Sequence, residues 1–283
     1  MIVGELTWQQ FRSLDSIRNL NENQQIAHYH KYLVELNDWI GHQNKGRLVD
    51  TIITCIDGMD VIFLVDYTGS MGTAINAIKA AIASIVSAII TESANNYRLG
   101  LALFDETTSE TVSRYSTGSA YVALPAEQKY VNTGLNGRYQ WITAMETLSN
   151  NNESTFTSQL NILNSSAFSI GSGVGGPEPS DMGVDRIVNY DLVGSFRNDV
   201  SKLVIVITDN TPSGNDDVTN ATDVAFIDQL VEDCNAKGIK VLVMKPNANS
   251  LSPLETLALE TGGLVSESFT PSAIVTSIEN ICA

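Results

Sequence analysis

Five near-continuous apolar runs recur between residues 60 and 283, and stretches of helical length separate them. The runs lie at 61–66, 98–105, 202–209, 240–245 and 264–269, and the amphipathic stretches lie at 74–93, 154–166, 220–238, 252–263 and from Pro271 onward. Strands that are apolar along their whole length are buried on both faces, as in parallel sheets covered by helices. The sequence therefore predicts an α/β fold with a doubly wound, mostly parallel sheet flanked by helices.

The residues before this pattern have a different character. Residues 23–43 predict an otherwise polar helix with a narrow apolar seam at 3-4 spacing, formed by Ile26, Tyr29, Leu33, Leu36 and Ile40. We therefore expect an N-terminal helical arm over 1–56 and an α/β domain over 57–283. The seam either packs on its own domain or docks onto other subunits, and an isolated helix this short is marginal.

Residues 105–153 form a polar, turn-rich insertion that interrupts the alternation. The stretches "TVSRY" and "AYVAL" around "STGS" predict a β-rich insertion with a hairpin. Loops on rigid scaffolds often carry recognition, and Arg114, Tyr115 and Tyr121 are of residue types enriched at interface hot spots. We expect them to bind a partner, unless the hairpin only protects the edge of the sheet.

Charge narrows the choice of partners. The 283 residues carry a formal net charge of −16, which disfavours nucleic acid and anionic membranes and suits divalent cations. The first residues lack a basic head followed by an apolar core, and we identify no membrane span of about 18 apolar residues. The expectation is a soluble chain made in the cytoplasm, with incorporation into a virion or another assembly as a further possibility.

Cys55, Cys234 and Cys282 are widely separated in the chain and include no Cys-x-x-Cys pair. This spacing indicates neither a disulfide framework nor a zinc site. We expect small buried or terminal thiols.

Acidic and hydroxyl side chains gather where two predicted strands end. Asp66 closes the run at 61–66 and Asp209 closes the run at 202–209, while Thr68 and Ser70 lie in the turn after Asp66. Ligands of open α/β sheets bind beyond the carboxyl ends of the strands. An all-oxygen group suits Mg²⁺, Ca²⁺ or Mn²⁺ and not zinc. The alternative is that Thr68 or Ser70 caps the next helix.

The stretch "DVIFLVDYTGSMG", residues 60–72, resembles the D-x-[ST]-G-S-M motif of the metal-ion-dependent adhesion site in von Willebrand factor A domains. The resemblance continues through "RLGLALFD", "FTSQLNILN", "GVGGPEPSDMG" and "FRNDVSKLVIVITDNTP", in the expected order over residues 58–283. It implies a Rossmann-like fold in which Thr68 and Ser70 ligate the metal directly. Asp66 and Asp209 would hold it through water, and a carboxylate of a protein partner would occupy an open position.

One position departs from the family pattern. Alignment on Pro177 and Glu178 places Gly175 where relatives carry an oxygen ligand from the second loop. Ser172, Ser180 or Asp181 from the same loop, or a water molecule, would take its place.

Two sequence motifs that would indicate an enzyme fit their families less well. "GSGVGG", residues 171–176, follows a predicted helix instead of a strand, so its context does not fit a dinucleotide site. Thr68 stands where haloacid-dehalogenase-type phosphatases require a second aspartate. The sequence thus predicts a divalent-cation-dependent, adhesion-type protein-binding module, and not an enzyme. The alternative is a structural subunit of a larger assembly, such as a virion or phage tail, with a degenerate metal site.

Overall fold

The computed structural model describes residues 54–282 except 136, 172, 173, 215, 217, 247 and 269, together with 11–12, 14, 17–20, 24–25, 28–29 and 32. The chain divides into two compact units, Met1–Ile52 and Ile53–Ala283. The division falls close to the expected boundary between residues 56 and 57.

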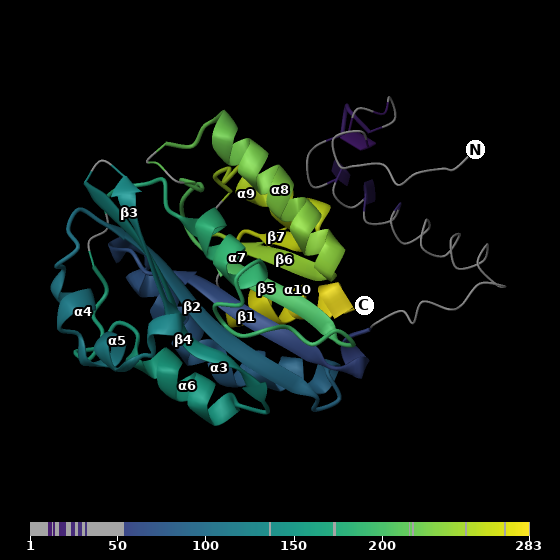
Figure 1. Ribbon diagram of the computed structural model, residues 1–283. Coiled ribbons are helices and arrows are strands. Elements are labelled where there is room, and N and C mark those ends of the chain that lie inside the picture. The colour runs from purple at the N-terminus through teal and green to yellow at the C-terminus, as the bar shows by residue number, and fades with distance from the viewer. Residues whose placement is uncertain are drawn as a thin grey trace. The chain divides into compact units, whose positions relative to one another are not determined.

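The second unit contains a seven-stranded mixed sheet in the order β3-β4-β2-β1-β5-β6-β7 (Figure 1). Its strands are β1 (Met59–Asp66), β2 (Tyr97–Thr107), β3 (Lys129–Leu135), β4 (Arg138–Asn150), β5 (Ser201–Ile207), β6 (Ile239–Met244) and β7 (Leu264–Ser266). The strands β2, β1, β5, β6 and β7 run parallel, and β4 and β3 pair antiparallel at one side. Every residue of β1 is buried, as its apolar run predicts for a central strand.

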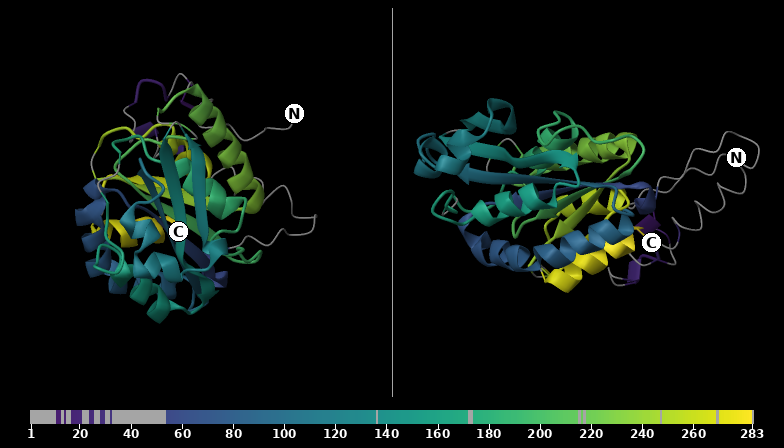
Figure 2. Two further views of the ribbon diagram at one scale, coloured as in Figure 1. Left: turned by 60° about the vertical axis from the view of Figure 1, so that its left-hand side comes forward. Right: turned by 90° about the horizontal axis from the view of Figure 1, so that it is seen from below.

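Helices cover both faces of this sheet, which confirms the predicted α/β class (Figure 2). One face carries α3 (Gly72–Glu92), α6 (Glu153–Ile162) and α10 (Pro271–Cys282), and the other carries α7 (Ser180–Val188), α8 (Ala221–Lys237) and α9 (Leu254–Glu260). Two apolar cores result, one on each side of the sheet. Short helical turns complete the order: η1 (Cys55–Asp57), η2 (Gly69–Met71), α4 (Ser113–Ser116), α5 (Ser119–Ala123) and η3 (Ala126–Gln128).

The helix α3 is unusually apolar. Together with η2 it forms the segment Gly69–Glu92, which is long and apolar enough by composition to cross a membrane. Its isoleucines at 75, 78, 85 and 89 are nevertheless buried in the core beside the sheet. This burial is typical of the core helix of a soluble protein.

In the first unit, the described residues Gln24, Gln25, His28, Tyr29 and Tyr32 are helical. Tyr29 lies against Phe11, with 5.0 Å between the ring centroids. The remainder of the predicted helix over 23–43, including Leu33, Leu36 and Ile40, lies outside the described residues. The expected helical arm therefore stays a prediction.

The insertion at 105–153 differs from the expectation in its details. The predicted strands "TVSRY" and "AYVAL" instead lie largely in the short helices α4 and α5. The hairpin of this region is formed further along by β3 and β4, and β4 pairs with β2 inside the main sheet. In these helical turns, the rings of Tyr115 and Tyr121 pack on Trp141 of β4. This packing accounts for the helical turns in place of the expected strands.

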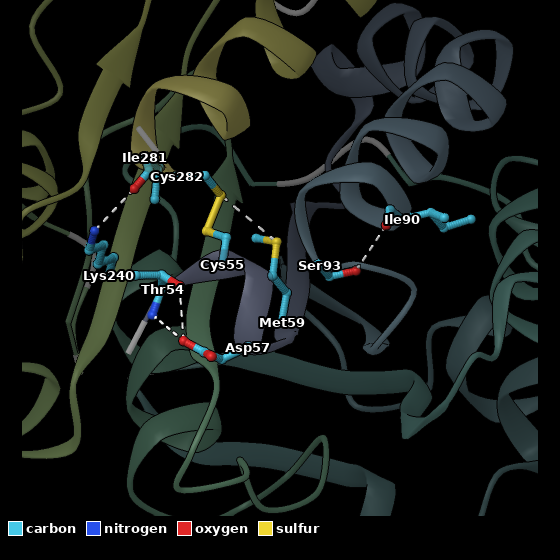
Figure 3. Close-up of a disulfide and its surroundings, with 9 residues drawn as sticks. All are labelled: Thr54, Cys55, Asp57, Met59, Ile90, Ser93, Lys240, Ile281 and Cys282. Carbon is cyan, nitrogen blue, oxygen red and sulfur yellow. Dashed lines mark hydrogen bonds between the residues drawn. A yellow bond between two sulfur atoms is a disulfide. The ribbon is translucent and has the colours of Figure 1, made fainter. Parts of the chain in front are cut away.

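The expectation of free thiols is wrong for two of the three cysteines. Cys55, in η1 before β1, forms a disulfide with Cys282 at the end of α10 (Figure 3). The Cys282 sulfur also lies 3.9 Å from the Met59 sulfur. Cys234 is free and buried, as expected. Structural disulfides are typical of oxidising environments, so this pairing does not favour the expected cytoplasmic setting.

Candidate metal centre

The predicted carboxylates lie at one edge of the sheet because their strands are parallel neighbours. In the ladder between β1 and β5, Val65 pairs with Ile207, so Asp66 and the Thr208-Asp209 pair follow at the same level. The turn with Thr68 and Ser70 leads from Asp66 into η2 and α3. This brings the four predicted ligands to the carboxyl edge, where open α/β sheets bind ligands.

Asp66 is fully buried and is held by hydroxyl groups. The Thr68 hydroxyl donates to Asp66 Oδ1 at 2.6 Å, and the Thr208 hydroxyl donates to Asp66 Oδ2 at 2.7 Å. The backbone N–H of Thr68 also donates to Oδ1, at 3.0 Å. Both carboxylate oxygens therefore have neutral donors, which orient the group without balancing its charge.

The capping alternative does not describe what the Thr68 hydroxyl does. Thr68 is the N-cap residue of η2 but makes no side-chain capping hydrogen bond, because its hydroxyl hydrogen points at Asp66. Oxygen lone pairs of Thr68 are then left for another group. The Ser70 oxygen lies 3.4 Å from the Thr68 oxygen, and Ser70 is exposed. The two hydroxyls thus lie close together, with the Thr68 side chain buried beside Asp66 and Ser70 exposed to solvent.

The electrostatics of the edge are strongly anionic. Burial raises the pKa of Asp66 to about 7, hydrogen bonds from Thr68 and Thr208 lower it, and the charge of Asp209 raises it. Such a shift means that a negative charge at this position is poorly compensated.

The backbone conformation of the second loop accounts for the glycine at position 175. Gly175 has a φ of +92°, in the region that side-chain-bearing residues rarely adopt, so an oxygen ligand there would strain the backbone. Of the three predicted substitutes, Ser172 lies outside the described residues. Ser180 is buried, and its Oγ has no hydrogen-bond partner among the described residues.

Asp181, the third substitute, is engaged elsewhere. Its carboxylate accepts hydrogen bonds from the backbone N–H groups of Gly214 and Met182. Burial raises its pKa to about 7, and the charge of Asp223 raises it further. These contacts place Asp181 beside the loop that precedes α8, so it is a weaker candidate than Ser180, whose hydroxyl is unengaged among the described residues.

Glu178, which is not among the ligands expected from the sequence, also belongs to this edge. Its backbone N–H donates to Thr211 O at 2.9 Å, and its carbonyl accepts from Ser213 N at 3.0 Å, which ties the second loop to the segment after β5. Burial raises the pKa of Glu178 to about 10, and the charges of Asp66, Asp105, Glu106 and Asp209 raise it further. The Pro-Glu-Pro sequence after a glycine turn is the signal that would have marked it.

Unsatisfied oxygens test whether these residues fit a cation. Asp209 Oδ1, Glu178 Oε2 and Ser180 Oγ are buried, and none has a hydrogen-bond partner among the described residues. Buried polar atoms are normally paired, so these three oxygens, from the segment that leads into α7 and the segment after β5, are open to an added partner. Asp105 Oδ1 is buried and unpaired in the same way. Within the described part of the chain, no group of three or more His, Cys, Asp or Glu side chains is arranged to hold a metal. The fit therefore depends on the hydroxyls of Thr68 and Ser70 as well as on carboxylates.

The predicted partner-binding residues are not at an open rim. Tyr115 and Tyr121 are buried, and Tyr115 stacks on Trp141 with 4.2 Å between ring centroids. Arg114 donates to Asp105 Oδ2 from Nε at 2.8 Å and from Nη2 at 2.5 Å. This burial and these internal contacts do not favour the expected role in binding a partner, because the three residues already contribute packing and charge balance inside the fold.

Comparisons with known proteins found no match: no protein-family model matches the chain, and no curated protein matches it.

Proposed function

We propose that the protein is a divalent-cation-dependent binding module in which Asp66, Thr68, Ser70 and Asp209 hold Mg²⁺, or Ca²⁺ or Mn²⁺ in its place. Glu178 and Ser180 join this group as candidates from the second loop. The observation that carries the proposal is the buried carboxylate of Asp66, which two hydroxyls orient at the same edge of the sheet as the unpaired buried oxygens of Asp209 and Glu178. Binding, and not catalysis, is the proposed role.

A cation at this edge would supply the positive charge that these residues lack. The Thr68 and Ser70 oxygens are neutral, so a cation held partly by them keeps much of its charge toward solvent. An acidic side chain of a partner protein is the natural group to meet it, because carboxylate oxygens are preferred by hard cations. The protein residues fix the cation's position, and the partner's carboxylate completes the contact.

Isothermal titration calorimetry with Mg²⁺ and Mn²⁺ tests the proposal. We expect saturable binding of one cation by the wild type and no binding by Asp66→Ala. Asp228→Ala, which removes an exposed carboxylate on α8, is the matched control and should bind as the wild type does. Circular dichroism of each variant separates loss of binding from loss of fold. Equal isotherms for the wild type and Asp66→Ala would overturn the proposed site.

The alternative of a structural subunit with a degenerate site makes the opposite forecast. In that case the wild type binds neither cation, and its oligomeric state in size-exclusion chromatography does not change with EDTA. That pair of results would replace the binding-module proposal with the assembly role.

A further inference from the structure

A pocket of about 370 Å³ adjoins the candidate metal centre. It lies between the first turns of α3 and residues that follow β5, β6 and β7, and it is lined by Ser70, Met71, Thr73, Ala74, Ala77, Asp209, Pro246, Ser268 and Thr270. Ser70 and Asp209 belong to both the pocket and the metal centre. A group bound to a cation there would therefore lie next to the pocket.

The lining of the pocket suits an uncharged ligand group. Among the described residues that line the pocket, Asp209 alone is charged, and it belongs to the cation site. Met71, Ala74, Ala77 and Pro246 supply apolar surface. The volume lies within the range of small-ligand sites, which are mostly apolar with a few polar groups that orient the ligand.

Two of the hydroxyl groups in the lining already have partners. Ser268 Oγ lies 3.0 Å from Thr270 Oγ1 and accepts from the Thr270 backbone N–H at 3.2 Å. Thr270 Oγ1 also accepts from the Ala273 N–H at 3.3 Å. These two hydroxyls do not call for a polar ligand group, so burying an aliphatic one beside them leaves them satisfied.

We infer that this pocket binds the aliphatic part of a ligand whose carboxylate coordinates the cation at Asp66, Thr68 and Ser70. The inference rests on the proposed function and adds a ligand class to it: an acidic group with a branched aliphatic group beside it. In a partner protein this corresponds to an aspartate or glutamate next to leucine, isoleucine or valine. Each buried methylene contributes about 0.8 kcal/mol, or about fourfold in affinity.

Two carboxylates that differ only in their tails provide the probes. Acetate and 4-methylpentanoate are titrated into the wild-type protein with saturating Mg²⁺, and their affinities are measured by saturation-transfer difference NMR. We expect 4-methylpentanoate to bind at least about tenfold more tightly than acetate. With EDTA in place of Mg²⁺, both should lose binding.

Variants on one helix separate the pocket from the rest of the surface. Ala77→Leu fills the pocket from α3, and it should bring the affinity of 4-methylpentanoate down to that of acetate. Ala80→Leu adds the same side chain at an exposed position of α3 outside the pocket lining and should retain the tenfold preference. Thermal unfolding of both variants controls for damage to the fold.

The outcomes distinguish failure of the pocket from failure of the metal centre. Equal affinities for both carboxylates in the wild type, with Mg²⁺ binding intact, overturn the pocket and leave the proposed function standing. Binding of 4-methylpentanoate that persists in EDTA overturns the link between pocket and cation. Absence of Mg²⁺ binding in calorimetry overturns the proposed function and this inference with it.

Discussion

Asp66, the last residue of β1, and Asp105, two residues before the end of the neighbouring parallel strand β2, are buried carboxylates that are stabilised by different means. Asp66 pairs with Phe104 across the β1–β2 ladder, so Asp105 is one residue further along the same edge. Asp105 Oδ2 accepts hydrogen bonds from the Arg114 guanidinium and from the Tyr115 hydroxyl, the latter at 2.6 Å. Asp66 instead accepts hydrogen bonds from two hydroxyls and one backbone N–H.

The difference shows which carboxylate has its counter-charge in the chain. Burial raises the pKa of Asp105 to about 6, with Arg114 as the main opposing influence. Burial raises the pKa of Asp66 to about 7, and the neighbouring Asp209 charge adds to the rise. Asp105 has a cationic partner from its own insertion. Asp66 is also held by hydrogen bonds, but its donors are all neutral, which agrees with the proposal that an external cation completes the site.

Neutralising each carboxylate in turn gives the largest expected contrast. Asp105→Asn should cost about 3 to 5 kcal/mol of unfolding free energy, because it leaves the Arg114 charge buried without its anion. Asp66→Asn, in cation-free buffer, should cost less than about 1 kcal/mol, since it removes a poorly compensated charge and keeps the shape. Urea unfolding in EDTA measures both.

Cation binding provides the reciprocal readout for this pair. Asp66→Asn should lose Mg²⁺ binding, and Asp105→Asn should retain it at temperatures where the variant is folded. Equal losses of stability in the two variants would remove the distinction between the two strand ends.

Removing a hydroxyl at the end of β5 or of β2 should give an effect of intermediate size. Thr208→Val removes the donor to Asp66 Oδ2, and we expect Mg²⁺ affinity to fall about tenfold, as for other groups that orient metal ligands. Thr107→Val at the end of β2 is the matched control, because Thr107 accepts a hydrogen bond from Trp141 Nε1 at 2.9 Å. It should lower stability by about 1 kcal/mol and leave Mg²⁺ affinity unchanged. A parallel fall in affinity for both variants would argue for a general loosening of the edge.

The pH dependence of stability gives the smallest contrast. The unfolded chain releases the Asp66 proton near the ordinary value of 3.8, while the folded protein holds it up to about 7. Stability from this group is therefore fully present below about 4 and is lost as the pH rises through about 7. In EDTA, the contribution of Asp66 to the unfolding free energy should fall by on the order of 1 kcal/mol between pH 6 and pH 8.

Two comparisons sharpen this pH measurement. Asp181, whose pKa is also raised to about 7, contributes in the same direction, so Asp66→Asn should remove only part of the fall. Saturating Mg²⁺ should flatten the curve of the wild type by stabilising the ionised site. Stability that rises with pH over this window in EDTA would contradict the uncompensated charge at Asp66.

The sheet could be predicted because each of its central strands is a continuous apolar run in the sequence. The run at 61–66 is apolar throughout and became β1, and the runs at 202–209 and 240–245 became β5 and β6 with shifts of one or two residues. The strand β4 was not predicted from "RYQWITAMETLSN", because polar residues alternate irregularly with apolar ones there. The helix α7 was missed for a similar reason, since its buried residues include Ser180, Asp181 and Asp185.

The candidate site was predictable where it depends on strand ends and not where it depends on loop paths. Asp66 and Asp209 follow from the rule that parallel strands end at a common edge. Glu178 reaches this edge through backbone hydrogen bonds to Thr211 and Ser213, which no periodicity encodes. The burial of Tyr115 and Tyr121 depends on Trp141, a contact between residues on different elements. Sequence pattern alone made these tyrosines look like surface residues.

The disulfide between Cys55 and Cys282 makes the α/β domain a closed ring, because its partners are 227 positions apart and enclose every strand of the sheet. Tension applied through the chain that precedes Cys55 is shared at once between β1 and α10, so neither terminal element can be peeled away on its own. Asp66 is at the opposite end of β1 from this junction. If a ligand at the candidate metal centre and the chain before Cys55 were pulled apart, the force would act along β1. The hydrogen bonds of β1 to β2 and β5 would then be loaded in shear on both sides.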